Sequence, residues 1–82
     1  MLINYYLDEN NILYAHNENY DVLRVFNVND NRWDRVTFYF DEFSHNHNLT
    51  FLNDEEVKKI TTISPESSMR ETIDLLKKNN WY

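Results

Sequence analysis

The sequence predicts an α+β fold, in which a four-stranded antiparallel β-meander of two hairpins precedes two helices. Both helices are expected on one face of the sheet, as a two-layer sandwich. Residues 1–40 alternate strand-forming residues with short Asn- and Asp-rich segments. Residues 53–80 carry helix-capping motifs and apolar side chains at helical spacing. A chain of 82 residues has the length of one domain, which we expect to span residues 1–82.

The predicted meander is built around two turn-rich segments. Residues 8–11 and residues 29–32 are rich in Asn and Asp, which tolerate the left-handed backbone conformation in a chain that has no glycine. The four strands are predicted at residues 2–7, 12–16, 22–28 and 33–40. A polar connecting loop is expected over residues 41–52.

The first helix is predicted from a capping box. Asn53 can serve as the N-cap, and Glu56 three residues later can reach back to the backbone of Asn53. Leu52 and Val57 are spaced as a hydrophobic staple, so the helix should begin after Asn53 and end near Thr61.

The second helix is predicted from Ser64-Pro65-Glu66, which supplies an N-cap, a proline at the first helical position and an acid at the positive helix end. Met69, Ile73 and Leu76 recur with helical spacing and should form its buried stripe. The helix should end near Lys78, and the terminal Trp81-Tyr82 is expected to pack on the core or on a partner.

Strand register predicts which sheet face stays open. Pairing Val28 with Trp33 groups Leu23, Val25, Val36, Phe38 and Phe40 on an apolar face for the helices. Pairing Leu7 with Ile12 adds Ile3, Tyr5, Tyr14 and His16 to that core and leaves Leu13 outside. The uncovered face then carries Tyr6, Arg24, Phe26, Trp33, Arg35 and Tyr39.

This open face has two interpretations. Trp, Tyr and Arg are the residue types that dominate protein interfaces, so the six side chains can form a partner-binding patch. Alternatively, Phe26 with Arg35 and Trp33 with Val28 are cross-strand pairs that only stabilise the hairpin.

The acidic residues offer a second surface. Lys and Arg total 8 against 14 Asp and Glu, which gives a net charge of −6 and argues against direct binding of nucleic acid. Carboxylates at Asp41, Glu42, Asp54 and Glu55 can attract a basic groove on a partner protein. The alternative is that acids such as Asp54 and Glu55 only stabilise first helical turns.

Motifs for chemistry are weak. His45-Asn46-His47 spells the letters of a nuclease motif, but adjacent residues cannot surround one phosphate. Asp41, Glu42, His45 and His47 are possible ligands of a transition metal, but a polar loop is favoured because no regular conformation brings all four side chains together. No metal, cofactor or catalytic residue is therefore expected.

We expect a small, acidic, non-enzymatic protein-binding module, of the inhibitor or neutralising type, such as an anti-defence or immunity protein. Thirteen Asn, one Ala and no Gln indicate an AT-rich gene, as in a low-GC bacterium or its phages. The first eight residues lack the pattern of a signal peptide or membrane span, so a cytoplasmic location is expected. The alternative is a structural, self-associating protein that covers the open face as a homodimer.

Overall fold

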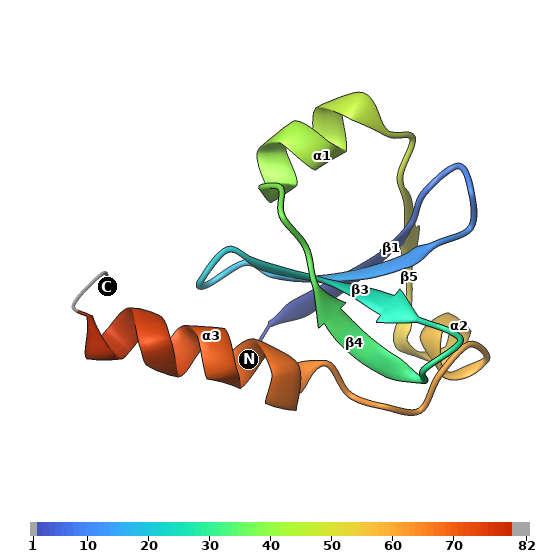
Figure 1. Ribbon diagram of the computed structural model, residues 1–82. Helices are drawn as coiled ribbons and strands as arrows, with labels where there is room; N and C mark the ends of the chain where they lie inside the picture. The colour runs from blue at the N-terminus through green and yellow to red at the C-terminus, as the bar shows by residue number, and fades with distance from the viewer. Residues whose placement is uncertain (1, 80–82) are drawn as a thin grey trace.

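A computed structural model describes residues 2–79 and shows a five-stranded antiparallel sheet with the order β4-β3-β2-β1-β5 (Figure 1). The strands are β1 (Ile3–Leu7), β2 (Leu13–Asn17), β3 (Val22–Asn27), β4 (Arg32–Arg35) and β5 (Thr50–Leu52). The helices are α1 (Phe40–Asn46), α2 (Asp54–Lys58) and α3 (Glu66–Lys78). Trp81 and Tyr82 lie outside the described residues, so their expected packing stays a prediction.

The α+β class and the antiparallel sheet are confirmed, but the segment predicted as a connecting loop is structured. Within residues 41–52 lie most of α1 and all of β5, which pairs with β1 at the opposite edge from β4. The fourth strand ends at Arg35 instead of continuing to Phe40, because the chain turns away from β3 toward α1. The sheet therefore gains a strand at one edge and is shortened at the other.

Left-handed residues close each of the three hairpin turns between β1 and β4. Asn11, Asp21 and Asn31 have φ angles of 61°, 53° and 53°. Asn and Asp populate this region more readily than other non-glycine residues. In a glycine-free chain they supply the conformation that such turns require.

The turn between β1 and β2 differs by one residue from the predicted register. The Asp8 carboxylate accepts hydrogen bonds from the backbone N–H groups of Asn10 and Ile12, at 2.8 and 3.0 Å. The turn consequently extends to Ile12, and Leu7 pairs with Leu13. A shift of one residue exchanges the faces of β2, so Leu13 lies inside, whereas Tyr14 and His16 face the other side of the sheet.

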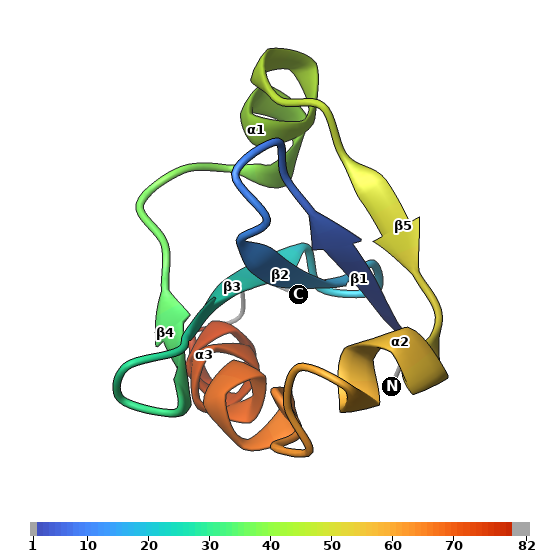
Figure 2. The ribbon, with the colours of Figure 1, turned by 90° about the vertical axis from the view of Figure 1, so that its right-hand side faces the viewer.

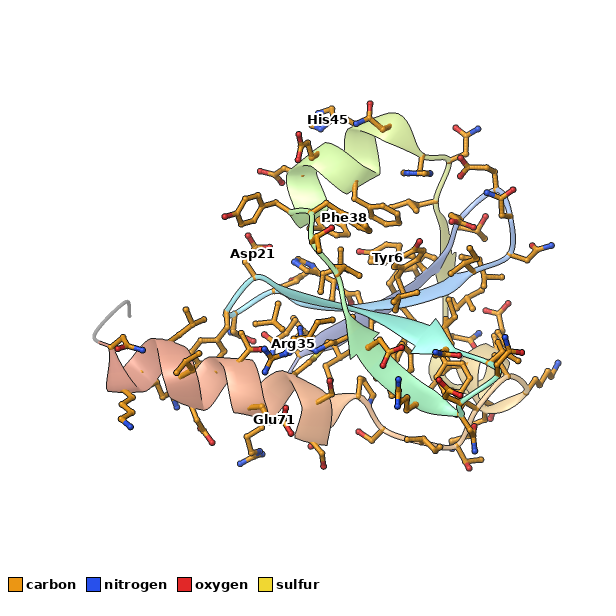
Figure 3. All side chains as sticks on the ribbon, viewed as in Figure 1. Tyr6, Asp21, Arg35, Phe38, His45 and Glu71 are labelled. Atoms are coloured by element: carbon orange, nitrogen blue, oxygen red, sulfur yellow. The ribbon has the colours of Figure 1, made fainter. Side chains whose placement is uncertain are left out.

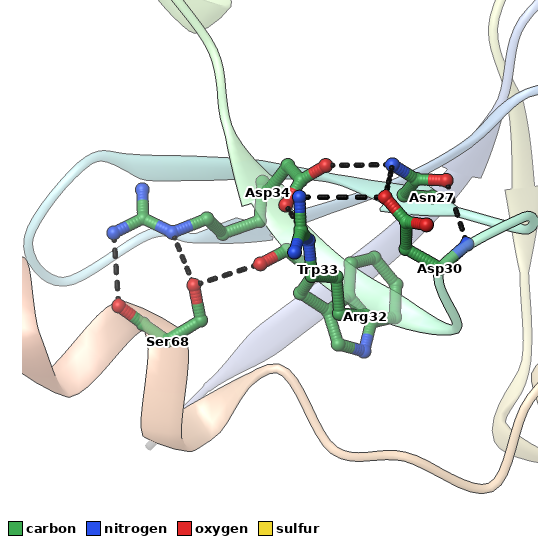
Figure 4. Close-up of polar contacts among 7 residues, drawn as sticks. Asn27, Asp30, Arg32, Trp33, Asp34 and Ser68 are labelled. Carbon is green, nitrogen blue, oxygen red and sulfur yellow. Dashed lines mark hydrogen bonds and ion pairs between the residues drawn. The ribbon is translucent and has the colours of Figure 1, made fainter.

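The turn between β3 and β4 shifts the predicted pairing by two residues, which preserves the facing. Asn27 binds the backbone N–H of Asp30 through Oδ1 and the Asp34 carboxylate through Nδ2, and Arg32 binds Asp34 at 2.8 Å (Figure 4). Hydrogen bonds from Asn27 and then from Arg32 lower the pKa of Asp34. Phe26 consequently pairs with Trp33 rather than with Arg35.

The capping box of α2 is confirmed. The Asn53 side chain accepts from the backbone N–H of Glu56 at 2.9 Å, and the Glu56 carboxylate accepts from the backbone N–H of Asn53 at 3.1 Å. Leu52 and Val57 are both buried, as a hydrophobic staple requires. The helix is shorter than predicted and ends at Lys58, after which Ile60 and Thr61 still bond to the carbonyl of Val57.

Replacing Asn53 with alanine is expected to lower the free energy of unfolding by about 1 kcal/mol, because the replacement leaves the backbone N–H of Glu56 without its side-chain acceptor. Urea denaturation followed by circular dichroism measures the change. Asn53→Asp is the matched control, since aspartate caps helices as well as asparagine. An equal loss in both variants would contradict a capping role.

The sheet carries helices on both faces, which corrects the predicted two-layer arrangement. Figure 2 shows α1 on one side of the sheet and α2 and α3 on the other. The larger core lies beneath α2 and α3, and it contains Leu13, Ala15, Val22, Phe26, Trp33, Leu52, Val57, Met69 and Ile73. A smaller core beneath α1 joins Tyr14, Leu23 and Phe43.

In the described part of the chain, none of the helices combines the length and apolar character needed to cross a bilayer.

Candidate functional site

The predicted open face is the principal buried face of the sheet. Arg24, Phe26 and Trp33 are only 4%, 5% and 6% exposed, because α3 packs over them. The prediction placed the helices on the opposite face because that face seemed continuously apolar. The shifted register instead sets the polar Asp34 opposite Val25, so β4 contributes little apolar surface there.

Arg24 fastens α3 to the sheet. Its Nε donates to the hydroxyl of Ser68 at 2.8 Å, and one Nη donates to the Ser68 carbonyl at 2.9 Å and to the Thr72 hydroxyl. The Ser68 hydroxyl in turn donates to the carbonyl of Trp33 at 3.2 Å (Figure 4). Burial, followed by the nearby charge of Arg35, lowers the pKa of Arg24.

Trp33 is held both by packing and by one directed bond. The indole Nε1 donates to the carbonyl of Ile63 at 2.7 Å, which ties β4 to the segment that leads into α3. The ring lies 5.1 Å from Phe26 and 6.2 Å from Tyr5, measured between centroids. Trp33 and Phe26 therefore serve the core and are not available to a partner in this fold.

The other three residues of the predicted patch are separated. Tyr6 lies on the α1 face, with its ring 5.4 Å from Phe40. Arg35 is exposed and forms an ion pair of 3.6 Å with Glu71 of α3. Figure 3 shows Tyr6 and Arg35 on opposite sides of the sheet. Tyr39 is 77% exposed at the start of α1.

Two aromatic side chains are exposed where the chain leaves β4, and we call Phe38 and Tyr39 the aromatic ridge. Phe38 is 38% exposed, and its inner side stacks on Phe43 at 5.3 Å. On one side of the ridge a groove of about 310 Å³ separates it from Leu76 of α3. On the other side, Phe38 lines a smaller hollow of about 210 Å³ with Glu42.

The groove follows an edge of β3 that has no strand beside it. Because β4 ends opposite Arg24, Leu23 and Val22 line the groove directly. The carbonyl of Leu23 accepts a hydrogen bond of 3.0 Å from the Arg24 guanidinium. Because β4 ends at Arg35, the edge of β3 beside the groove stays open, and the chain leaves the sheet through Phe38 and Tyr39 to reach α1.

Carboxylates border the ridge. Asp21 lines the groove with a side chain that is 59% exposed, and it lies on the same side of the sheet as Phe38 in Figure 3. Asp41 and Glu42 are exposed in the first turn of α1, directly after the ridge. The aromatic ridge and the three carboxylates beside it therefore combine exposed aromatic surface with negative charge.

The predicted acidic surface is divided by the sheet. Asp41 and Glu42 belong to α1, whereas Asp54 and Glu55 belong to the first turn of α2 on the opposite side (Figure 2). The four carboxylates cannot face one groove of a partner. Asp54 and Glu55 sit where negative charge favours a helix N-terminus, as the structural alternative predicted.

The four residues of the rejected metal cluster are also separated, although Asp41, Glu42 and His45 lie in α1 and not in the polar loop that was predicted. Nδ1 of His45 lies 2.6 Å from the backbone carbonyl of Asp41, within α1. His47 directly follows this helix, with its ring 4.8 Å from that of Phe43, and its Nδ1 lies 2.9 Å from the carboxylate of Glu9 in the turn between β1 and β2. Sequence spacing gave no signal for the latter contact, because the two residues are 38 positions apart.

Three other side chains of catalytic types have structural contacts. His16 is buried, with its ring stacked on Phe40 at 4.0 Å and its Nε2 2.7 Å from Asp21. The hydroxyl of Ser64 accepts from the backbone N–H of Glu66 at 3.2 Å. The N-cap of α3 is Pro65 and not Ser64 as predicted, because the helix begins one residue later, at Glu66. Ser44 donates to the carbonyl of Asp41.

Comparison with protein-family models, with curated proteins and with solved structures found no match to this chain.

Proposed function

We propose that this chain is a non-enzymatic, cytoplasmic protein-binding module that neutralises or inhibits a partner by covering part of its surface. The single observation that carries the proposal is the exposure of Phe38 and Tyr39 side by side, with Tyr39 77% exposed. The partner is a protein whose contact surface is basic and contains an apolar recess. The aromatic ridge would enter this recess.

The aromatic ridge has the character of an interface centre. Phe and Tyr bury a large area with few torsions, and such residues carry most of the binding energy at protein interfaces. Phe38 is already fixed against Phe43, so its ring loses little conformational freedom on binding. The hollows on both sides of Phe38 let a partner surround the ring.

The charge around the ridge favours a basic partner over a second copy of this chain. Asp21, Asp41 and Glu42 would attract Lys and Arg on a partner and raise its association rate. In a symmetric dimer through the ridge, the same carboxylates would face each other and repel. The predicted homodimer would have covered the sheet face that α3 covers in this structure. Self-association through the aromatic ridge is instead tested by the sedimentation measurement described below.

The biological setting is proposed from composition. An acidic protein of 82 residues with an AT-rich residue usage suits an immunity-type or anti-defence protein of a phage or low-GC bacterium. Its negative charge suits the neutralisation of a basic partner, such as a protein that itself binds nucleic acid. Such a protein would act without a cofactor.

The test compares two variants of exposed apolar residues. Phe38→Ser/Tyr39→Ser removes the aromatic ridge, and Val28→Ser removes a side chain that is 74% exposed in the distant turn between β3 and β4. After cross-linking in the source cells has identified a partner, we expect the ridge variant to bind the purified partner more than about tenfold more weakly. The Val28 variant should bind as the unmodified chain does. Calorimetric titration measures the dissociation constants, and circular dichroism checks the folds.

Two further measurements address charge and self-association. Asp41→Asn/Glu42→Gln should slow association and weaken its dependence on salt. Equal binding by the ridge variant and the Val28 variant would overturn the assignment of the ridge. So would a dimer, seen by sedimentation at several concentrations, that dissociates when Tyr39 is replaced, because the ridge would then be a self-association surface.

A further inference from the structure

Asp8 is a buried carboxylate that is only partly satisfied. Its side chain is 5% exposed, and Oδ1 accepts from the backbone N–H groups of Asn10 and Ile12. The second oxygen, Oδ2, has a single contact, from the hydroxyl of Tyr14 at 3.5 Å. Burial and then the charge of Asp8 raise the pKa of Tyr14.

The charge of Asp8 has no ion-pair partner among residues 2–79. A buried carboxylate is costly unless a cation or several donors compensate it. Two backbone N–H groups serve one oxygen, so the side of the carboxylate that carries Oδ2 is where a cation would be stabilised.

Two further residues with metal-binding side chains lie close to Asp8. Glu9 follows Asp8 in the turn between β1 and β2, and His47 comes from the segment that joins α1 to β5. Figures 1 and 2 both show this turn beside that segment. One ligand atom from each of the three residues lies within 4.8 Å of the other two. Hydrogen bonds from its own backbone and from His47 lower the pKa of Glu9.

We propose that Asp8, Glu9 and His47 form a binding site for a divalent first-row transition cation such as Zn²⁺, which clasps the β1–β2 turn to the α1–β5 connection. The three donors are two carboxylate oxygens and one imidazole nitrogen. Imidazole suits Zn²⁺, Ni²⁺ and Cu²⁺, whereas Mg²⁺ and Ca²⁺ prefer sites made of oxygen alone. The site needs a transition cation for its nitrogen ligand.

The geometry is close to what such a cation requires. Ligand atoms around a tetrahedral Zn²⁺ with bonds of 2.0–2.2 Å lie about 3.4 Å apart. Nδ1 of His47 and Oε1 of Glu9 already lie 2.9 Å apart. These two side chains are more exposed than Asp8, which its turn holds in place, so small rotations of Glu9 and His47 would complete the ligand geometry. Water would complete the coordination, because three protein ligands leave positions open.

Binding should stabilise the fold, because Glu9 and His47 are 38 residues apart in the sequence and only the folded chain brings them together. With Zn²⁺ in large excess over its dissociation constant, the melting temperature should rise by more than about 5 °C. The chelator EDTA should reverse the shift. Mg²⁺ at the same concentration should leave the melting temperature unchanged.

The assignment is tested by titrating Zn²⁺ into the metal-free chain and into single variants. Asp8→Asn, Glu9→Gln and His47→Gln should each weaken binding by more than about tenfold. Asp8→Asn retains the oxygen that accepts from Asn10 and Ile12, so the turn is preserved. The matched control is His45→Gln, which removes an exposed imidazole outside the cluster and should bind Zn²⁺ as the unmodified chain does.

Co²⁺ provides a direct view of the ligands. Bound Co²⁺ should show visible absorption bands that change in the Glu9 and His47 variants and not in the His45 variant. The proposal is overturned if calorimetry finds no one-to-one Zn²⁺ binding. It is equally overturned if His45→Gln abolishes binding while His47→Gln leaves it intact, since the metal would then be held by an unrelated surface histidine.

Discussion

Replacing Trp33 with alanine is expected to lower the free energy of unfolding by about 3–5 kcal/mol, because the change empties a large volume in the main core. The indole is 6% exposed and packs between Phe26 and Tyr5. The variant also loses the hydrogen bond to the carbonyl of Ile63. A domain of this size has a total stability of only about 5–15 kcal/mol, so a large part of the variant should be unfolded at elevated temperature.

Urea denaturation followed by far-ultraviolet circular dichroism measures this effect independently of tryptophan fluorescence. Trp33→Phe keeps most of the ring volume and loses the donor to Ile63, so it should cost about 1–2 kcal/mol. Val28→Ala, at a site that is 74% exposed, is the control for an open position. If Trp33→Ala changed stability by no more than the Val28 control, Trp33 would lie on an uncovered face and the packing of α3 would be wrong.

Replacing Arg24 with alanine is expected to cost about 2–4 kcal/mol, because the guanidinium makes charge-assisted hydrogen bonds that no neighbouring donor replaces. Three of its acceptors, the Ser68 hydroxyl and carbonyl and the Thr72 hydroxyl, are on α3, and the fourth is the carbonyl of Leu23 on β3. The loss should therefore loosen α3 in particular. Hydrogen exchange of the α3 amides, measured together with global unfolding, detects this local opening.

Arg35 is the matched control for Arg24, since the two arginines are directly opposite each other in β3 and β4. Arg35 is exposed and its ion pair with Glu71 is long, at 3.6 Å, so Arg35→Ala should change stability by less than about 0.5 kcal/mol. Ser68→Ala should cost about 1 kcal/mol, because it removes the hydroxyl that links Arg24 to the carbonyl of Trp33. Equal losses for both arginines would contradict the anchoring role of Arg24.

The features that sequence predicted correctly are those fixed by a few adjacent residues. The capping box at Asn53 and Glu56 was visible because its donors and acceptors are three residues apart. Ser64 and the apolar spacing of Met69 and Ile73 located α3 in the same manner. Asn in the turns predicted left-handed conformations, because no glycine was present to provide them.

The missed elements have weak local signals. α1 has seven residues and an N-cap, Tyr39, whose side chain makes no capping bond. β5 has three residues and is a strand only because it pairs with β1. The packing of Phe43 against Tyr14 and Leu23 stabilises α1, and those residues are far away in the sequence. A helix or strand of this kind depends on tertiary contacts that local propensity does not contain.

The candidate site was predicted only in part. Tyr39, Asp41 and Glu42 were named from residue type, and the structure brings them together with Phe38 at the start of α1. Arg24, Phe26 and Trp33 were assigned to the same patch because residue type does not distinguish an interface aromatic from a core aromatic. Glu9 and His47 could not be joined by spacing, because their contact depends on the fold of two separate segments.

By itself, the sequence determined the α+β class, the first four strands, the capped helix α2, the location of α3 and the shared facing of Phe26 and Trp33. Only the tertiary structure decided which face the helices cover. Both faces of β1 to β3 carry apolar and aromatic side chains, so alternation alone could not rank them. The Asp8 turn fixed the face of β2, and β5 beside β1 led the chain into α2 and α3 on the side of Trp33. Burial of that face left the short α1 to cover the other and left Tyr39 exposed.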